Sequence, residues 1–442
     1  MAAPVPLPTV DAPCFLCGEA AADPVWATPD RAFSAPGLYS VMRCRGCGFL
    51  YQRPRVADDH LADCYPDHYP RHQEPSPRLP FKGSPARVRA VRWALATALG
   101  YEALRDRRAS ALTRLRARLL LRRLSWDCPP WRGQGRYLDV GCGSGGALGV
   151  ARALGWRTAG VEVDAAAADK ARRFADELHV GEVQTAPFAP ARFDLVTAFH
   201  VLEHVPDPVG MTRRMLEWLA PGGLLIVEVP NAGGLGARLF GCAWSGLELP
   251  RHLSHFTPQS LGDVVRRAGG RIAWCRHRAQ PRWYFWSLRH WLRDRGRNGL
   301  ARLAERRPVH GVLKFGLEIA LPLVARAGRG EVIRAGVVRA AAEGEASGYG
   351  DPPSGARRRA AAGGEASEDG EPPERSEAAS RSRRRGERRW RTPRAERGGE
   401  PGDGGDGLAA IHKPLDNWMR ATLPYGRNRF PRPDAKRLEA AP

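Results

Sequence analysis

Short apolar segments that contain or lead into glycine, acidic or polar residues recur in the middle of the chain. Residues 137–146 read Y-L-D-V-G-C-G-S-G-G, residues 158–163 read T-A-G-V-E-V, and residues 193–199 read F-D-L-V-T-A-F. Runs of this length with few charged residues are typical of strands that are buried in a sheet. The pattern therefore predicts strands whose carboxyl ends carry glycines and acidic side chains.

The first of these segments is predicted to bind a nucleotide-type cofactor. Gly141, Gly143 and Gly145 permit a strand-to-helix turn with backbone angles that a side chain would forbid. They also let a cofactor lie against bare backbone. Asp139 places a carboxylate at the tip of the strand.

The same glycines leave two other interpretations open. Their spacing also fits G-x-G-x-x-G through Gly146, with Glu162 as the acidic residue of a dinucleotide site, and a plain tight turn is the third reading. A hydride-transfer site requires an apolar strand up to its glycines, whereas a positively charged cofactor is stabilised by a carboxylate beside it. Asp139 therefore favours a positively charged cofactor.

Further motifs follow the glycine loop in order. H-V-L-E-H-V-P-D-P occupies residues 200–208, and L-A-P-G-G-L-L-I-V-E-V-P-N occupies residues 219–231. This succession resembles the class I S-adenosylmethionine-dependent methyltransferases, in particular the bacterial small-molecule branch that includes the ubiquinone-type O-methyltransferases. The resemblance implies a seven-stranded, doubly wound, Rossmann-like α/β fold. It also implies that the cofactor, S-adenosyl-L-methionine, is bound by Asp139, Gly141, Cys142, Gly143, Ser144, Gly145, Glu162 and Val163.

The resemblance covers residues 134–340. Residues 238–261 resemble the substrate-side insert of the same branch, and a helix with Val264 and Val265 on its apolar side is predicted after it. Residues 328–339 resemble the final hairpin of the sheet. Within the cofactor site, the resemblance implies that Glu162 binds the ribose hydroxyls.

The amino terminus carries two C-x-x-C-G motifs, at residues 14–18 and 44–48. Each motif can present two thiolates to one tetrahedral metal, and its glycine relieves the tight turn. Neither motif lies beside a β-α-β pattern, which argues against a redox dithiol. The motifs predict a zinc ribbon with one structural Zn²⁺, held by Cys14, Cys17, Cys44 and Cys47. Four thiolates leave no open coordination position, so this metal is not expected to take part in the chemistry.

A hydroxyl acceptor must lose its proton during methyl transfer, and a histidine with an ordinary pKa can accept it near neutral pH. We expect His204 to be the base, with His200 as the second candidate and Glu203 as a residue that orients a histidine. His252 and His255 are further candidates on the opposite side of the acceptor. For each histidine the alternative is a hydrogen-bonded structural role.

His200, Glu203 and His204 also spell H-x-x-E-H, which on a continuous helix is a zinc peptidase motif. The stretch directly follows a predicted strand, and Pro206 and Pro208 would interrupt the helix that this motif needs. A peptidase is therefore not expected.

The 442 residues include 69 Lys and Arg against 47 Asp and Glu. From residue 341 onward the chain consists largely of Gly, Ala, Glu, Pro, Ser and Arg, so it cannot bury enough apolar surface to fold and is predicted to be disordered. That segment holds 20 of the Lys and Arg against 17 Asp and Glu, and its basic runs would attract phosphate without specificity, so a nucleic-acid partner is not expected. No basic start is followed by an apolar run, and the remaining cysteines are scattered, which predicts a cytoplasmic setting.

Residues 86–124 are predicted to be helical and are strongly basic. Leu112, Leu115 and Leu119 repeat at helical spacing, and arginines fill the other faces. We interpret this segment as a connector packed on the catalytic domain, with weak membrane-surface contact as the alternative. The aromatic and basic residues 283–293 support that alternative, although such a segment is more often the wall of a substrate pocket.

These interpretations divide the chain into a zinc ribbon (1–72), a basic helical connector (73–133), a methyltransferase domain (134–340) and a low-complexity tail (341–442). The predicted activity is methyl transfer to a small-molecule acceptor, at a hydroxyl of a sugar, a phenol or quinone, or a polyketide-type metabolite. The alternatives are a non-catalytic cofactor-binding scaffold or regulator and an NAD-dependent oxidoreductase. The sequence does not specify the acceptor or the oligomeric state.

Overall fold

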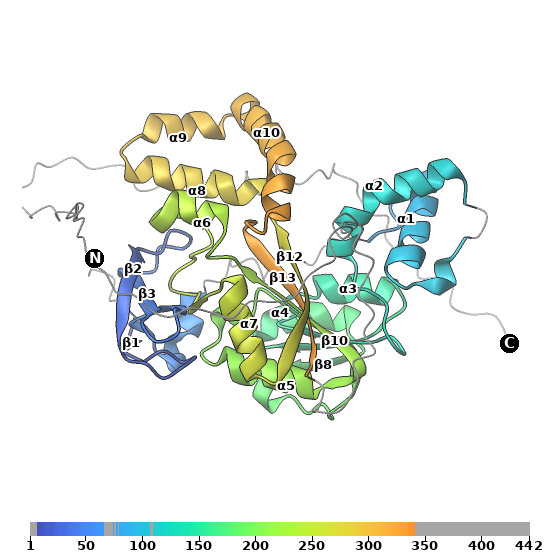
Figure 1. Ribbon diagram of the computed structural model, residues 1–442, viewed down its shortest axis with the longest axis horizontal. Helices are drawn as coiled ribbons and strands as arrows, with labels where there is room; N and C mark the ends of the chain where they lie inside the picture. Colours follow the sequence, from blue (N-terminus) through green and yellow to red (C-terminus); the bar gives the residue numbers. More distant parts are fainter. Residues whose placement is uncertain (1–6, 66–73, 75–76, 78, 107–108, 341–442) are drawn as a thin grey trace, which may run out of the picture. The chain divides into compact units, whose positions relative to one another are not determined.

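A seven-stranded sheet forms the centre of the fold. The computed structural model describes residues 7–65, 74, 77, 79–106 and 109–340 (Figure 1), so the predicted tail lies outside the described residues. The order across the sheet is β12-β13-β10-β9-β6-β7-β8, with β13 antiparallel to both neighbours and the other pairs parallel. This confirms the predicted doubly wound sheet. Its strands are β6 (Arg136–Val140), β7 (Arg157–Glu162), β8 (Glu177–Val180), β9 (Phe193–Phe199), β10 (Leu219–Pro230), β12 (Gly270–Arg278) and β13 (Val332–Arg339).

The strand order reverses beside β6. From β6 the chain continues to β7 and β8 on one side, and to β9 and β10 on the other. In sheets of this kind ligands bind at such a switch point, outside the carboxyl ends of the strands. The glycine loop follows β6 and residues 200–208 follow β9, so the topology brings both predicted site segments to this place.

Helices that begin at side-chain caps flank the sheet. Asp164, Asp207 and Thr257 each accept a hydrogen bond from a backbone N–H in the first turn of α4, α5 and α7. In α7, Val264 and Val265 are buried, as predicted, in the core that also includes the apolar side of β10. The flanking helices are α3 (Gly146–Ala153), α4 (Ala165–Ala171), α5 (Pro208–Glu217) and α7 (Pro258–Arg267).

The amino-terminal module takes one of its strands from the larger domain. A four-stranded sheet has the order β11-β4-β3-β2, in which β11 (Ser254–His255) pairs antiparallel with β4. Next to this pairing, the rings of Phe49 and Phe256 are 5.7 Å apart and meet edge to face. The two parts of the chain therefore share a sheet and a core. The strands of the module are β1 (Thr9–Val10), β2 (Ala22–Thr28), β3 (Tyr39–Cys44), β4 (Leu50–Gln52) and β5 (Arg55–Val56).

The basic segment is two helices, where the sequence predicted a single helical stretch from 86 to 124. α1 (Pro85–Ala98) ends before Gly100, whose φ of 79° does not fit a right-handed helix, and α2 (Ala111–Asp127) packs against α1. α2 packs through Ala117 and Leu124, which lie on one face. Its leucine stripe lies on the opposite face and is more than half exposed, comprising Leu112, Leu115 and Leu119.

Three helices separate β12 from β13. The predicted hairpin at residues 328–339 is wrong, because that span contains only β13, whose antiparallel partners are β10 and β12. No helix among the described residues combines the length and the apolar character needed to cross a bilayer. The helices of this region are α6 (Leu235–Phe240), which precedes β11, and α8 (Pro281–Asp294), α9 (Asn298–Glu305) and α10 (Arg307–Arg326), which form the insert.

Candidate functional site

The turn after β6 has the backbone that its glycines predicted. Gly141, Gly143 and Gly145 have φ angles of 67°, 53° and 88°, in the left-handed region that favours glycine. A Cβ atom at Gly141 would lie 2.6 Å from Cγ2 of Val201, and one at Gly145 would lie 2.9 Å from Cα of Ala171. Only glycine therefore fits at these two positions without displacing its neighbours.

Two carboxylates lie beside this loop. Glu162, at the end of β7, accepts hydrogen bonds from the backbone N–H of Gly143 at 2.7 Å and of Asp164 at 3.0 Å. Asp139 accepts a hydrogen bond of 2.6 Å from the hydroxyl of Thr197. Burial, reinforced by the charge of Glu162, raises the pKa of Asp139 to about 7. A positively charged ligand at this place would favour the ionised form of Asp139.

The other predicted cofactor residues differ in exposure. Cys142 is buried, and its Sγ would lie 3.0 Å from a Cβ atom at Gly160, so it fills space between the loop and β7. Ser144 is half-buried. Val163 is 62% exposed at the carboxyl edge of the sheet, directly after Glu162. All three lie on the loop or beside it, and their role in binding a cofactor stays a prediction.

His200 lies between two carboxylates. Its Nδ1 is 3.0 Å from Oε1 of Glu203, and its Nε2 is 3.3 Å from Oε1 of Glu228 on β10. Burial disfavours the charged ring, but the hydrogen bonds to these carboxylates outweigh it and raise the pKa of His200 to about 10. Arg334 also contacts Glu228, at 2.5 Å. The ring is therefore protonated at neutral pH.

His204 lies in the opposite electrostatic environment. Its Nδ1 is 2.9 Å from the hydroxyl of Tyr65 and 3.1 Å from the backbone oxygen of Arg251. Burial, together with the neighbouring His252, lowers the pKa of His204 to about 4. The ring is neutral at neutral pH. Because a carbonyl oxygen can only accept a hydrogen bond, the contact to Arg251 assigns the proton to Nδ1 and the lone pair to Nε2.

The two distal histidines are buried beside His204. The rings of His204 and His252 are 4.6 Å apart, and Nδ1 of His252 donates to the backbone oxygen of Gly246 at 3.0 Å. Burial lowers the pKa of His252 and of His255 to about 3. His252 therefore adjoins the predicted base, while His255 lies in β11 and pairs with Leu50 of β4.

Glu203, His204 and His252 each offer one ligand-type atom within 4.8 Å of the others. Glu203 is fully buried, and its Oε2 has no hydrogen-bond partner among the described residues. The arrangement differs from the peptidase motif, because His200 is turned towards Glu228 and residues 202–204 form a single 3-10 turn where that motif needs a long helix. The geometry agrees with the expectation that this motif does not mark a peptidase.

Sequence reasoning missed the ion pair that fixes the segment carrying His252. Arg251 is fully buried and makes two hydrogen bonds to Asp30, of 2.7 and 2.9 Å. The same guanidinium donates to the backbone oxygen of Cys64, next to Tyr65. The two ion-paired residues are 221 positions apart, so no local pattern could have revealed their contact.

The four cysteines of the paired motifs come together. Cys14 and Cys47 have Sγ atoms 3.7 Å apart, those of Cys17 and Cys44 are 3.4 Å apart, and all four lie within 4.8 Å of one another. Four thiolates at the usual Zn–S distance would be about 3.8 Å apart in a tetrahedron. The donor set and its spacing therefore fit one zinc ion.

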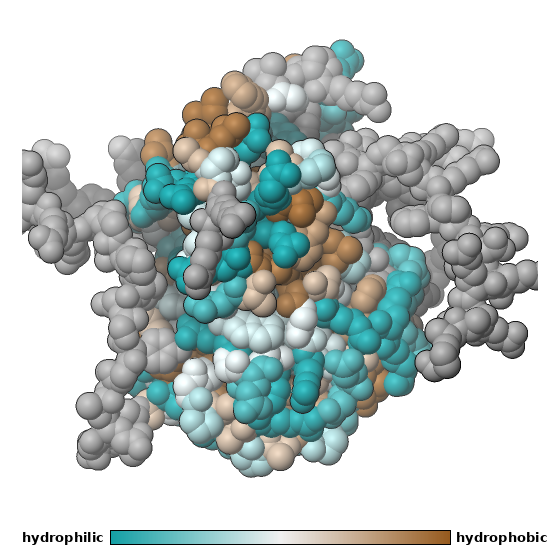
Figure 2. Space-filling view, turned by 90° about the vertical axis from the view of Figure 1, so that its right-hand side faces the viewer, coloured by the Kyte–Doolittle hydropathy of each residue, from teal (hydrophilic) through white to brown (hydrophobic). Residues whose placement is uncertain are grey.

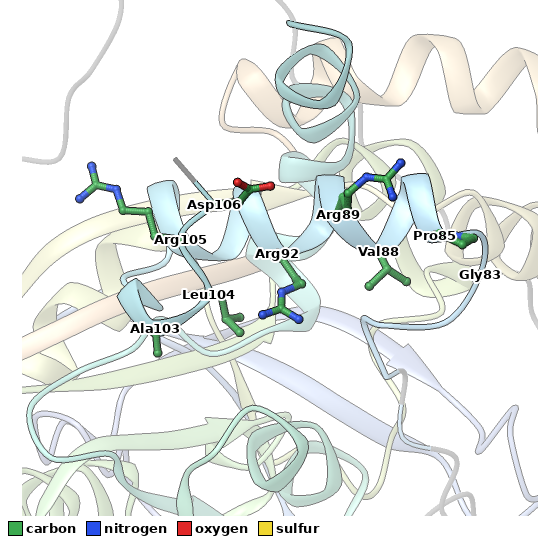
Figure 3. Close-up of a pocket in the computed structure, with 9 residues that line it drawn as sticks. All are labelled: Gly83, Pro85, Val88, Arg89, Arg92, Ala103, Leu104, Arg105 and Asp106. Atoms are coloured by element: carbon green, nitrogen blue, oxygen red, sulfur yellow. The ribbon is translucent and has the colours of Figure 1, made fainter. Parts of the chain in front are cut away.

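A separate pocket of about 630 Å³ lies between α1 and residues 103–106 (Figure 3). Arg89, Arg92, Arg105 and Asp106 contribute its charged groups. The figure shows Arg89 and Arg105 pointing in opposite directions. The polar groups of this pocket do not converge, and no predicted site residue lines the pocket. We therefore assign the pocket no part in the candidate site.

Comparisons with known proteins agree with the fold. A family model for a methyltransferase domain matches residues 103–273. The chain is similar to the ubiquinone biosynthesis O-methyltransferases of Albidiferax ferrireducens (36% identity, covering 25% of this chain and 47% of that protein) and of Xanthomonas campestris pv. campestris (34% identity, covering 30% and 61%). It thus spans about half to three fifths of these curated relatives.

Among solved structures, the chain is similar to the [4+2]-cyclase SpnF (21% identity, TM-score 0.34, covering 60% of this chain and 99% of that chain). It is also similar to an S-adenosylmethionine-dependent methyltransferase from Mesorhizobium loti (16% identity, TM-score 0.33, covering 50% and 97%). The strand order is that of the class I methyltransferase fold, and residues 103–273 match the family model for a methyltransferase domain.

Proposed function

We propose that this protein transfers a methyl group from S-adenosylmethionine to a small molecule. The observation that carries the proposal is the loop after β6, where three glycines with left-handed φ angles lie beside Asp139 and Glu162. Bare backbone next to two carboxylates suits a cofactor that has a ribose and a positive charge. When bound, the cofactor supplies an activated methyl group on a sulfonium. The protein then has to align the acceptor and remove its proton.

Within this proposal, Asp139 to Gly145 hold the methionine part of the cofactor. Glu162 holds the ribose hydroxyls, and the exposed Val163 offers an apolar contact at the same edge. Glu162 already braces the loop through Gly143, so ribose binding would place the sugar against a carboxylate whose position is fixed. The NAD-dependent alternative is disfavoured by Asp139, since its buried carboxylate would lie beside the phosphates of a dinucleotide.

We propose His204 as the general base, acting through Nε2. Its neutral ring and the proton assigned to Nδ1 leave that lone pair available at neutral pH. With a pKa lowered to about 4, His204 is a weaker base than the ordinary histidine expected from the sequence, so it needs a comparatively acidic hydroxyl as acceptor. This favours a phenol or quinol acceptor over a sugar, in line with the quinone-pathway names of the curated relatives.

His200 has a different role in this account. Its ring is held as a cation by Glu203 and Glu228, so it has no lone pair with which to accept a proton. We propose that it fixes the loop between β9 and β10 and orients Glu203 beside His204. The second catalytic candidate of the sequence is thus assigned a positioning role.

We propose one structural zinc ion at Cys14, Cys17, Cys44 and Cys47. Both motifs have the same turn: the N–H of Gly18 donates to Cys14 O, and the N–H of Gly48 donates to Cys44 O. Identical turns facing each other are what a four-thiolate site requires. The ion would stabilise the sheet to which β11 belongs, and so the position of His252.

The test is an assay for S-adenosylhomocysteine formation with a panel of catechols, quinols, sugars and polyketide-type acceptors, read by mass spectrometry of the methylated product. We expect turnover with a phenolic acceptor. Binding of S-adenosylmethionine without turnover on any acceptor, including those co-purified with the protein, would favour the cofactor-binding scaffold.

A further inference from the structure

The helical insert between β12 and β13 leaves an apolar side uncovered. Among the side chains of α10 that the structure describes, those of Leu321 and Ala325 are buried. Phe315, Ile319 and Leu323 are 67%, 62% and 65% exposed, and because they are four residues apart they lie on one side of the helix. A stripe of three large apolar side chains at this exposure is not needed for the packing of α10.

The neighbouring helix extends this surface. α9 packs against α10 and carries Leu300 and Leu303, which are 49% and 42% exposed. We call Leu300, Leu303, Phe315, Ile319 and Leu323 the α9–α10 face. Figure 2 shows apolar side chains gathered at the top of the molecule, at the height of α9 and α10 in Figure 1, with hydrophilic residues beside them. Gathered apolar exposure of this kind marks an interaction surface.

The insert is also strongly positive. Residues 281–326 contain ten Arg and Lys against three acidic residues, a net charge of +7. The three acidic side chains are already engaged: Asp294 with Arg31, Glu305 with Arg289, and Glu318 with Lys314. The insert therefore carries a large excess of positive charge next to the α9–α10 face.

Amphipathic aromatic side chains lie at the border of this region. Trp286 and Trp291 on α8 are half-buried. The guanidinium of Arg295 lies 3.8 Å from the ring centre of Trp291, and that of Arg282 lies 5.9 Å from the ring centre of Trp286. Tryptophan is enriched at the boundary between a bilayer and water, where its ring meets apolar chains and its N–H meets water.

We propose that the α9–α10 face docks on the surface of an anionic lipid bilayer. The helices would lie in the plane of the interface, with the apolar side chains among the acyl chains and the arginines at the head groups. A second copy of this chain fits the surface less well, because a symmetric contact would bring two lobes of net positive charge together. This proposal does not depend on the methyl transfer proposed above.

The insert is also joined to the candidate site. Trp283, in the first turn of α8, has its ring centre 6.3 Å from that of His200 and 6.3 Å from that of Trp244. The hydroxyl of Ser287 on the same helix is 3.3 Å from that of Ser245. A bilayer bound by α9 and α10 would therefore lie against the helical lobe that contributes a wall of the site.

Vesicle co-sedimentation with the full chain tests the proposal. The vesicles contain phosphatidylcholine alone, or phosphatidylcholine and phosphatidylglycerol in equal parts. We expect the wild type to bind the anionic vesicles and salt to weaken this binding. In the double variant Phe315→Gln/Ile319→Gln, the affinity for these vesicles should be lower by about tenfold or more. The matched control, Leu115→Gln/Leu119→Gln on α2, changes equally exposed apolar residues and should bind like the wild type.

A second variant, Arg302→Glu/Arg306→Glu, changes the charge without touching the apolar stripe and should also weaken binding to anionic vesicles. Equal binding by the wild type and the Phe315→Gln/Ile319→Gln variant would overturn the proposal, as would loss of binding only in the α2 control. A third outcome would also overturn the proposal. If the wild type does not bind vesicles, and light scattering shows a wild-type dimer that the Phe315→Gln/Ile319→Gln variant does not form, the face binds a second copy of this chain.

Discussion

The hydroxyl of Tyr65 lies 2.9 Å from Nδ1 of His204, although the two residues are 139 positions apart. Tyr65 belongs to the cysteine-bearing amino-terminal module (residues 1–72), and His204 follows the strand β9 of the seven-stranded sheet. The backbone oxygen of Arg251 meets the same nitrogen, and Arg251 is itself tied to Asp30 of the module. The amino-terminal module therefore contacts the proposed base directly.

Replacing Tyr65 by Phe removes one contact to the ring of His204 and keeps the aromatic packing. We expect turnover to fall about fivefold with the affinity for S-adenosylmethionine unchanged, because a lost hydrogen bond of ordinary strength costs about 1 kcal/mol. The measurement is kcat on the acceptor found by the assay above, beside calorimetry for the cofactor. Tyr39→Phe, which removes a hydroxyl bonded to the Pro36 oxygen in the same module, is the control and should retain full turnover.

His204→Ala removes the proposed base itself. Turnover should fall by about a hundredfold or more while cofactor affinity stays nearly constant. Joint loss of cofactor binding and turnover would show that His204 is a structural or cofactor contact. A variant that still turns over at the wild-type rate would contradict its assignment as base and direct attention to His252.

The ion-paired ring of His200 predicts a dependence of stability on pH. Its pKa rises from 6.5 to about 10 on folding, so the protonated ring stabilises the fold fully below pH 6.5, and this stabilisation is lost as the pH rises towards 10. The pKa of Glu228 falls from 4.5 to about 2, so its contribution is lost as the pH falls below 4.5. The free energy of unfolding should therefore differ most between wild type and His200→Gln from pH 4.5 to 6.5.

Urea denaturation of the wild type and of His200→Gln from pH 4.5 to 10 measures that difference in the free energy of unfolding. It should shrink steadily from pH 6.5 upward. A difference that stays constant up to pH 10 would mean that His200 is neutral in the folded protein, and would return it to the candidates for the base.

Replacing Cys44 by Ser should release the proposed zinc ion and unfold the amino-terminal module. Because β4 pairs with β11, which follows His252, we expect turnover to fall as well, while cofactor binding by the loop after β6 persists. Elemental analysis and calorimetry on the variant measure these outcomes. The exposed Cys275, changed to Ser, is a control that should keep its zinc. A wild-type protein that is folded and free of metal would rule out the zinc site.

Local patterns in the sequence predicted the sheet and the glycine loop. The strands β6, β7 and β9 are short apolar runs, and left-handed glycines such as Gly141 are a property of single positions, so both could be read without knowledge of distant contacts. The resemblance then supplied the number of strands and their doubly wound arrangement. The break between α1 and α2 was missed, although Gly100 stands at that place in the sequence.

The electrostatics of the site could not be predicted in the same way. His200 and His204 are four residues apart, yet the pKa of one ring rises and that of the other falls. The difference arises from partners that folding supplies, namely Glu228 on the next strand for His200 and Tyr65 from another module for His204. Spacing along the chain contains no information on these partners, so the sequence could name the histidines without separating their roles.

Calorimetric titration of the purified chain with S-adenosylmethionine, S-adenosylhomocysteine and NAD tests the central claim most directly. We predict binding of the first two and none of the third. Gly143→Val should abolish that binding, because a branched side chain at a φ of 53° distorts the loop and occupies the space of the cofactor. Tight binding of NAD, with none of S-adenosylmethionine, would contradict the account.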